Sequence, residues 1–223
     1  MQNQSSTYIK EIFTSIQGEG PYIGEKHIFV RFCKCNLKCD YCDTDFNIKN
    51  AKKYTADELF ETIKNINANT ISFTGGEPLL DVDFLYNFLS KYKSKLNKKI
   101  YLETNGTLFK ELEKIIDLID IISMDIKLKS ATKQEEQYQN NQQFLKIASK
   151  KETFIKIVFD NKITKEEIKN CINLAKENKS LIILQPKMPL DKETNLEKIY
   201  ENFYKEYPNT RLVPQVHKFL NII

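Results

Sequence analysis

Short apolar runs rich in β-branched residues alternate with amphipathic stretches along most of this chain. The runs have the length and composition of buried strands and lie at 27–32, 70–75, 99–106, 121–128, 153–159 and 181–186. Near-continuous apolar strands separated by helices predict an α/β fold with a parallel sheet covered by helices. About six strand–helix units are fewer than a closed barrel needs, which favours a partial, open parallel β/α barrel; a doubly wound sheet is the alternative.

The stretches between these runs carry signals for helix starts. Thr55 with Glu58, and Thr164 with Glu167, have the spacing of capping boxes, and each pair precedes an amphipathic pattern. We therefore expect helices that begin directly after both threonines.

Composition excludes several classes of protein. No run of eighteen apolar residues occurs, and the N-terminus lacks the apolar core of a signal peptide, so we expect a soluble cytoplasmic protein with no membrane contact. The net charge of +4 comes from scattered lysines without the basic stripe and aromatics that bind nucleic acid. We expect one domain over residues 1–223, in which the polar stretch 129–143 is the most loop-like segment and a candidate for mobility; the sequence leaves open whether it closes over the site.

The chain has only two arginines, Arg31 and Arg211, among 34 basic residues. A planar guanidinium binds a carboxylate through two parallel hydrogen bonds, which lysine cannot do. Arg31, four residues before Cys35, is therefore a candidate anion clamp. A surface or ion-pair arginine is an equal alternative on this ground alone.

Four of the five cysteines lie between residues 33 and 42. Cys35, Cys39 and Cys42 form a C-x3-C-x2-C set just beyond a strand, and three thiolates on one loop suit a metal or iron–sulfur cluster that keeps one position open. A structural zinc site would need a fourth ligand, but we expect Cys33 to face packing because side chains alternate along an extended strand. Cys171 lies on an apolar helical face and is interpreted as an inert buried thiol.

Polar or glycine-rich motifs follow five of the predicted strands. They are the cysteine loop, "GGEP" (75–78), "ETNG" (103–106), "DIK" (125–127) and "QP" (185–186). Because the carboxyl ends of parallel strands share one edge, and ligands bind there, we expect these motifs to meet in one site.

The cysteine spacing together with "TGGEP" (74–78) resembles the radical S-adenosylmethionine (SAM) enzymes. The resemblance implies that three cysteines hold a 4Fe–4S cluster, whose fourth iron is open to the amino and carboxylate groups of SAM. The glycines would let the backbone approach a ligand closely, and Glu77 would accept from an ammonium group.

Further stretches are similar to the 7-carboxy-7-deazaguanine synthase family of that superfamily. They are "SIQGEGPYIGEKHIFVR" (15–31), "CDT" (42–44), "ETNG" (103–106) and "RLVPQVHKFL" (211–220), and the similarity is thinnest over 129–180. It implies a homodimeric lyase with a reduced barrel that uses magnesium and an electron donor such as flavodoxin or ferredoxin. The implied substrate is 6-carboxy-5,6,7,8-tetrahydropterin, which is converted with loss of ammonia into 7-carboxy-7-deazaguanine for queuosine, a tRNA modification, or another 7-deazapurine.

The resemblance also implies a set of site residues. The cluster ligands are Cys35, Cys39 and Cys42. The SAM site comprises Tyr41, Cys42, Asp43, Gly76, Glu77, Ser123, Asp125, Lys127 and Gln185. The pterin site comprises Ile16, Gln17, Gly18, Glu19, Arg31 and Thr74, with Arg31 on the substrate carboxylate. Thr44 is the expected Mg²⁺ contact.

Two departures from the family pattern stand out. The chain has "DIK" at 125–127 where the family usually has "SPK", which puts the SAM contacts there in doubt, and "FCKC" introduces Cys33.

Two alternative functions stay open. Glycyl-radical-enzyme activases share the cysteine spacing, and "GEGPYIG" (18–24) resembles their opening loop. This alternative predicts a protein partner in place of a small acid. A non-enzymatic zinc module would bind one metal ion through Cys33 and the three other cysteines.

Overall fold

The computed structural model describes residues 6–40, 42 and 48–222. Within them, nine strands form one sheet in the order β3-β1-β2-β4-β5-β6-β7-β8-β9. The strands are β1 (Ser6–Ile16), β2 (Lys26–Phe32), β3 (Lys52–Thr55), β4 (Thr70–Gly75), β5 (Lys99–Thr104), β6 (Ile121–Ile126), β7 (Glu152–Phe159), β8 (Leu181–Pro186) and β9 (Thr210–Leu212).

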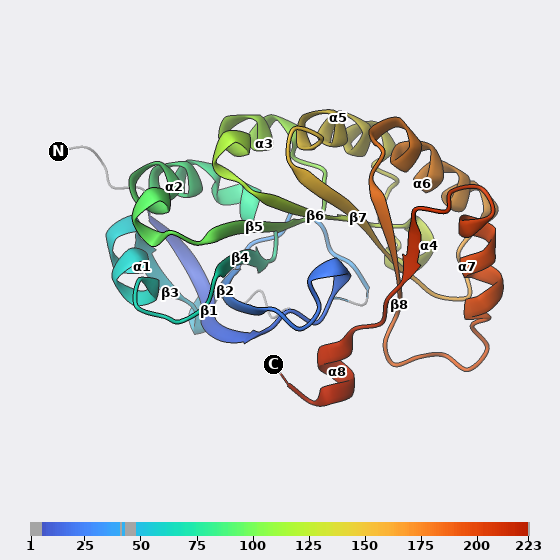
Figure 1. The fold of residues 1–223 in the computed structure, drawn as a ribbon, viewed down its shortest axis with the longest axis horizontal. Helices are drawn as coiled ribbons and strands as arrows, with labels where there is room; N and C mark the ends of the chain where they lie inside the picture. The colour runs from blue at the N-terminus through green and yellow to red at the C-terminus, as the bar shows by residue number, and fades with distance from the viewer. Residues whose placement is uncertain (1–5, 41, 43–47, 223) are drawn as a thin grey trace.

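The sheet is parallel from β2 through β9, and β1 pairs antiparallel with both β2 and β3. It curves into an arc whose described edge strands, β3 and β9, do not pair with each other (Figure 1). This arrangement confirms the predicted open, partial barrel, and the six predicted runs are β2 and β4 to β8.

Helices follow the outer side of this arc (Figure 1). They are α1 (Ala56–Ile63), α2 (Val82–Leu96), α3 (Phe109–Ile115), α4 (Lys129–Thr132), α5 (Tyr138–Ala148), α6 (Lys165–Asn178), α7 (Leu196–Tyr204) and α8 (Val216–Leu220), with 3-10 turns η1 (Gly20–Tyr22), η2 (Ile48–Asn50), η3 (Pro78–Asp81) and η4 (Ile116–Leu118). The short α8 and the turn that contains η1 are exceptions, since both lie on the inner side, and α4 lies beside β8 in this view rather than in the outer row (Figure 1).

Both predicted capping boxes are present. The Thr55 hydroxyl accepts from the Glu58 amide, and Thr164 and Glu167 make the same reciprocal contacts at the start of α6. These bonds satisfy amide groups that the first helical turn leaves without partners.

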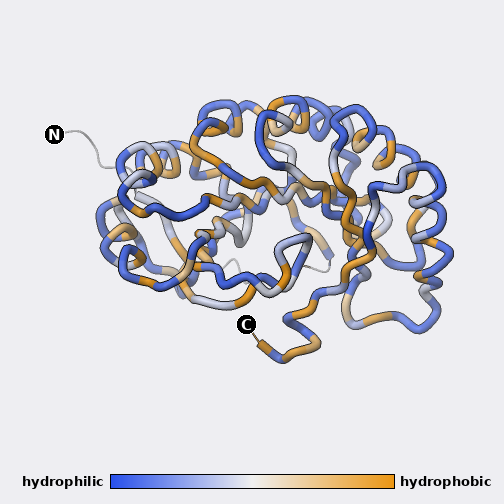
Figure 2. Tube along the Cα trace, in the orientation of Figure 1, coloured by the Kyte–Doolittle hydropathy of each residue, from blue (hydrophilic) through white to orange (hydrophobic). Residues whose placement is uncertain are grey.

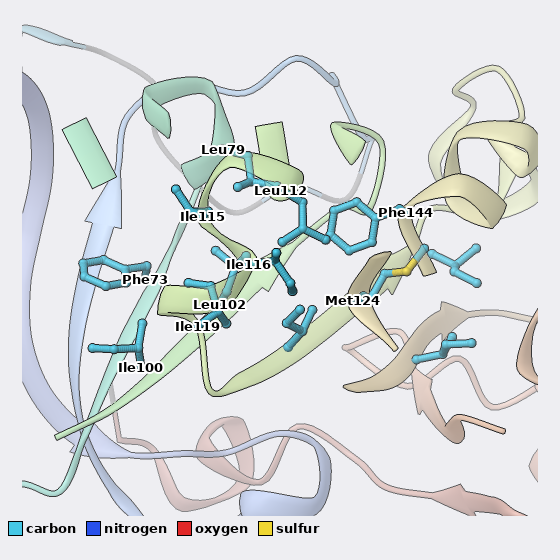
Figure 3. Close-up of a cluster of buried hydrophobic side chains, with 14 of the residues drawn as sticks. Phe73, Leu79, Ile100, Leu102, Leu112, Ile115, Ile116, Ile119, Met124 and Phe144 are labelled. Atoms are coloured by element: carbon cyan, nitrogen blue, oxygen red, sulfur yellow. The ribbon is translucent and has the colours of Figure 1, made fainter. Parts of the chain in front are cut away.

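The main core lies between the sheet and the outer helices. Hydrophobic residues follow the strands and the inward faces of these helices (Figure 2). Figure 3 shows Phe73 of β4, Leu102 of β5, Met124 of β6, Leu112 of α3 and Phe144 of α5 as members of one cluster, and all five side chains are fully buried. This packing fixes the outward face of the sheet and leaves the alternate side chains for the inner face.

The sequence analysis missed three strands, β1, β3 and β9. β1 has polar residues at many positions because it lies near the sheet edge, so it lacks a continuous apolar run. The description of 129–143 as loop-like was wrong in part, since α4 occupies 129–132 and α5 begins at Tyr138. The apolar face of α5 comes largely from residues after 143, including Phe144 and Leu145. Because these residues lie beyond the polar stretch, the stretch itself carried little sign of a helix.

No helix in the described part of the chain has both the length and the apolar character needed to cross a membrane.

Candidate active site

A cavity of about 550 Å³ opens at the carboxyl ends of the parallel strands, and its volume is in the usual range for small-ligand sites. The five predicted motifs all contribute to its wall, through Cys35, Cys39, Cys42, Gly75, Gly76, Glu103, Thr104, Asn105, Asp125, Lys127 and Gln185. The expectation that these motifs meet at one edge of the sheet is therefore confirmed.

The cavity wall follows from strand alternation. In the register of the sheet, Glu103 on β5 pairs with Ser123 on β6, and Asp125 on β6 pairs with Lys156 on β7. All four line the cavity, whereas neighbouring apolar residues of the same strands enter the core. A single polar residue inside an apolar run thus marks the inner face.

Cys35, Cys39 and Cys42 line the cavity, while Cys33 is 1% exposed and is not among the lining residues. Burial raises the pKa of Cys39 to about 11 and raises that of Cys35 as well, so both thiols are protonated at neutral pH and would lose protons on binding a metal cluster. Among residues 6–40, 42 and 48–222, no three Cys, His, Asp or Glu side chains converge closely enough to hold one ion. Ligands of a cluster bind different irons, so they need not converge on one point. Cys171 is buried in α6, as expected.

Gly76 and Glu77 of "GGEP" hold the cysteine loop against the end of β4. The Gly76 amide donates to the Phe32 carbonyl oxygen at 3.1 Å, and the Glu77 amide donates to the Lys34 carbonyl oxygen at 2.6 Å. A Cβ atom on Gly76 would lie 1.9 Å from that Lys34 oxygen. This close approach is between two backbone segments, and the approach of the glycine backbone to a ligand stays a prediction.

Two other segments also hold the cysteine loop. Asn105 of the β5 loop donates from Nδ2 to Oδ1 of Asn36 at 2.8 Å. After α4, Gln134 donates from Nε2 to the Lys38 carbonyl oxygen at 2.6 Å, and Lys133 forms an ion pair with Asp40. Part of the polar stretch 129–143 thus supports the cysteine loop.

Glu77 does not line the cavity. Its fully buried carboxylate accepts from the Thr104 hydroxyl at 2.9 Å and from the amides of Asn105 and Leu79 at 2.7 and 3.1 Å. Burial raises the pKa of Glu77 to about 7, although these hydrogen bonds oppose the shift. The carboxylate ties β4 to the β5 loop, and its predicted contact with an ammonium group stays a prediction.

Arg31 lines the cavity and is already oriented. Its Nε donates to Oε1 of Glu11 at 2.6 Å, and its guanidinium carbon lies 5.5 Å from the centre of the Phe13 ring. The alternatives of ion-pair arginine and anion clamp are thus compatible, because the Nη groups supply further donors for an anion.

The predicted pterin residues Ile16, Gln17, Gly18, Glu19, Arg31 and Thr74 all line the cavity. Among them lies Glu103, which the sequence analysis placed in the "ETNG" motif without giving its side chain a role. Gln17 Nε2 donates to Oε1 of Glu103 at 3.1 Å, and the Thr74 hydroxyl donates to Oε2 at 2.7 Å. A lone acid in the apolar run at 99–106 was the available signal.

A network of charges crosses the cavity floor. Lys156 contacts Glu19 and lies 3.3 Å from Oδ2 of Asp125, which also accepts from Lys127 Nζ at 2.9 Å. Burial raises the pKa of Glu19, but the charge of Lys156 and the hydrogen bonds from Gln215 and Lys156 outweigh it and lower the value to about 2. Lys156, a lone base in the run at 153–159, was missed.

The C-terminal segment completes the same wall. The Val216 amide donates to the Gly18 carbonyl oxygen at 2.9 Å, and Gln215 Nε2 donates to Oε1 of Glu19 at 2.7 Å. His217 also lines the cavity and packs against Gly18. The stretch "RLVPQVHKFL" was noticed in the sequence only as a family match, with no role for its side chains.

The predicted SAM residues Gly76, Ser123, Asp125, Lys127 and Gln185 line the cavity as well. In the described structure, Oδ1 of Asp125 and Oε1 of Gln185 are buried and have no hydrogen-bond partner. The predicted roles of Tyr41, Asp43 and Thr44 fall outside the described residues.

Comparison with known proteins places the chain in a family. The radical SAM superfamily profile matches residues 29–201. The 7-carboxy-7-deazaguanine synthase of Geobacter sulfurreducens is 32% identical, over 95% of this chain and 96% of the relative. The synthase of Archaeoglobus fulgidus is 34% identical, over 95% of this chain and 97% of the relative.

Among solved structures, QueE from Escherichia coli matches the fold with a TM-score of 0.69 and 20% identity, covering 97% of this chain and 96% of that chain. Fold, cysteine loop and relatives thus agree. The chain belongs to the radical SAM superfamily and, within it, to the family of the 7-carboxy-7-deazaguanine synthases.

Proposed function

We propose that this chain is a radical SAM carbon–nitrogen lyase that converts 6-carboxy-5,6,7,8-tetrahydropterin into 7-carboxy-7-deazaguanine with release of ammonia. The observation that carries the proposal is a single cavity lined both by three cysteines of the radical SAM spacing and by Gln17, Arg31 and Glu103. The same activity is supported by the two synthases named above, because the match to this chain covers 96% and 97% of their lengths.

Radical SAM enzymes use a 4Fe–4S cluster and SAM. The site fits both groups, because three cysteines share one wall and two buried acceptor atoms in the described structure, on Asp125 and Gln185, have no protein donor. The three cysteines would hold the cluster, and these two acceptors would meet hydroxyl or ammonium donors of SAM. When bound, the two groups together supply the radical that starts the reaction.

The protein's part is to hold the pterin in place and to keep water away from it. Arg31 would bind the substrate carboxylate. Glu103 would accept from adjacent N–H groups of the aminopyrimidinone ring, since a carboxylate matches such a pair of donors. The stacked rings of Phe13 and Phe29, with centres 5.0 Å apart, form an apolar wall beside them.

The proposal is tested by anaerobic incubation of the cluster-loaded protein with the carboxytetrahydropterin, SAM and dithionite. We expect a deazapurine, detected by its absorbance, and ammonia to form in equal amounts. Consumption of SAM without deazapurine would contradict the assigned substrate.

Glu103→Gln tests the ring contact. The substitution keeps the shape but replaces one acceptor with a donor, so we expect the KM for the pterin to rise about tenfold, with an unchanged iron content. Glu113→Gln, on an exposed glutamate of α3, is the matched control and should behave as wild type. An unaltered KM in Glu103→Gln would remove this contact from the account.

We further infer a single domain over residues 1–223 that acts as a cytoplasmic homodimer and receives electrons from a flavodoxin or ferredoxin. The family resemblance supports the dimer, and Phe219 and Leu220 of α8 expose apolar surface that a second copy could cover. Mg²⁺ at Thr44 belongs to the same proposal. Light scattering of the purified protein measures the oligomeric state, and a monomeric mass would contradict the dimer.

A further inference from the structure

Lys156 occupies an unusual position for a lysine. It lies in the middle of β7, its side chain is only 9% exposed, and it stands opposite Asp125 of β6 in the sheet register. A buried ammonium group is costly unless charged partners surround it. Its partners here are Glu19 and Asp125.

These two carboxylates are assigned to different ligands. Glu19 follows β1 and is among the residues assigned to the pterin, whereas Asp125 lies one residue before the end of β6 and is among those assigned to SAM. One ammonium group therefore contacts both predicted ligand sites.

The remaining contacts fix how each carboxylate is turned. Oε2 of Glu19 meets Lys156, and Oε1 accepts from Gln215. Oδ2 of Asp125 is shared by Lys127 and Lys156, while its buried Oδ1 has no partner among the residues that the structure describes. Lys156 thus draws one oxygen of Asp125 toward itself and leaves the other for a ligand donor.

We propose that Lys156 is a positioning residue that couples the pterin site to the SAM site, by holding Glu19 and Asp125 in one charge-balanced network. The assignment of the two ligands rests on the proposed function. A ligand that withdraws Asp125 from Lys156, or brings it closer, changes how Lys156 holds Glu19. Occupancy of one site therefore changes the affinity of the other.

Binding at equilibrium tests this coupling without turnover. The probes are SAM and 6-carboxypterin, the oxidised relative of the substrate, titrated into the cluster-loaded protein without reductant. For the wild type we expect the affinity for 6-carboxypterin to change about tenfold when SAM is present. In Lys156→Met, the affinity for 6-carboxypterin should be the same with and without SAM, so that the ratio of these two affinities is one.

Lys127→Met is the matched control, because Lys127 donates to the same oxygen of Asp125, whereas the ion pair with Glu19 is made by Lys156. We expect it to weaken SAM binding and to preserve the ratio. The proposal is overturned if Lys156→Met retains the wild-type ratio, if Lys127→Met abolishes it equally, or if the wild type shows no coupling.

Loss of one buried charge can prevent folding, so Glu19→Gln combined with Lys156→Gln provides a second variant. It removes one charge of each sign and leaves the Asp125–Lys127 pair balanced. We expect this double variant to fold and to bind without coupling, whereas a wild-type ratio in it contradicts the proposal. Product formation by the wild type reports separately on the proposed function. If the wild type forms product but binds 6-carboxypterin equally well with and without SAM, only the role of Lys156 is refuted. If the wild type does not bind the pterin, the proposed function and the role of Lys156 are both refuted.

Discussion

Substitution of Gly76 by alanine is expected to abolish assembly of the iron–sulfur cluster. The added methyl group would lie 1.9 Å from the Lys34 carbonyl oxygen, and that atom belongs to backbone that cannot rotate away. The loop that carries Cys35 would have to move off the end of β4 and lose the hydrogen bonds from Gly76 and Glu77. Three cysteines displaced in this way no longer match the corners of one cluster.

Iron content after anaerobic reconstitution measures this effect. Gly24→Ala is a suitable control, because Gly24 has a φ of +91° but a Cβ there would meet nothing within 4 Å. It tests backbone strain away from the cysteines, and we expect it to retain iron. Full iron content in Gly76→Ala would show that the packing of the cysteine loop on β4 does not matter for the cluster.

Arg31→Lys is expected to raise the KM for the pterin about 100-fold with the cluster intact. Lysine keeps the positive charge but loses the planar group that Glu11 and Phe13 orient. Its ammonium group cannot donate to Glu11 and also present two parallel donors to a substrate carboxylate. The comparison of KM with iron content separates lost binding from lost cluster.

Arg211→Lys is the matched control, since it replaces the other arginine of the chain at an exposed position in β9. Its KM should equal that of the wild type. An unchanged KM in Arg31→Lys would refute the anion clamp and leave Arg31 as a partner of Glu11 alone.

The repeating part of the fold was predictable because each buried strand leaves its own signal. The runs at 70–75 and 181–186 coincide with β4 and β8, and both capping boxes mark true helix starts. β1 and β3 were not predictable in this way. They pair antiparallel at the sheet edge, through contacts distant in sequence and with polar residues facing out.

The candidate site shows the same limit. Motif spacing found the cysteine loop, but it could not show that Glu77 points into the interior between β4 and β5. Lys156 was missed, and Glu103 received no role of its own, because one charge in an apolar run does not break a strand pattern. Only the register places Lys156 beside Asp125 and thereby gives it a charged partner.

The most direct test of the account is the iron content of oxygen-free protein combined with electron paramagnetic resonance of the reduced cluster before and after addition of SAM. The account predicts about four irons per chain and a signal that changes with SAM, because the three cysteines leave one iron open. Protein that contains zinc in place of iron, or a cluster whose signal ignores SAM, would contradict it.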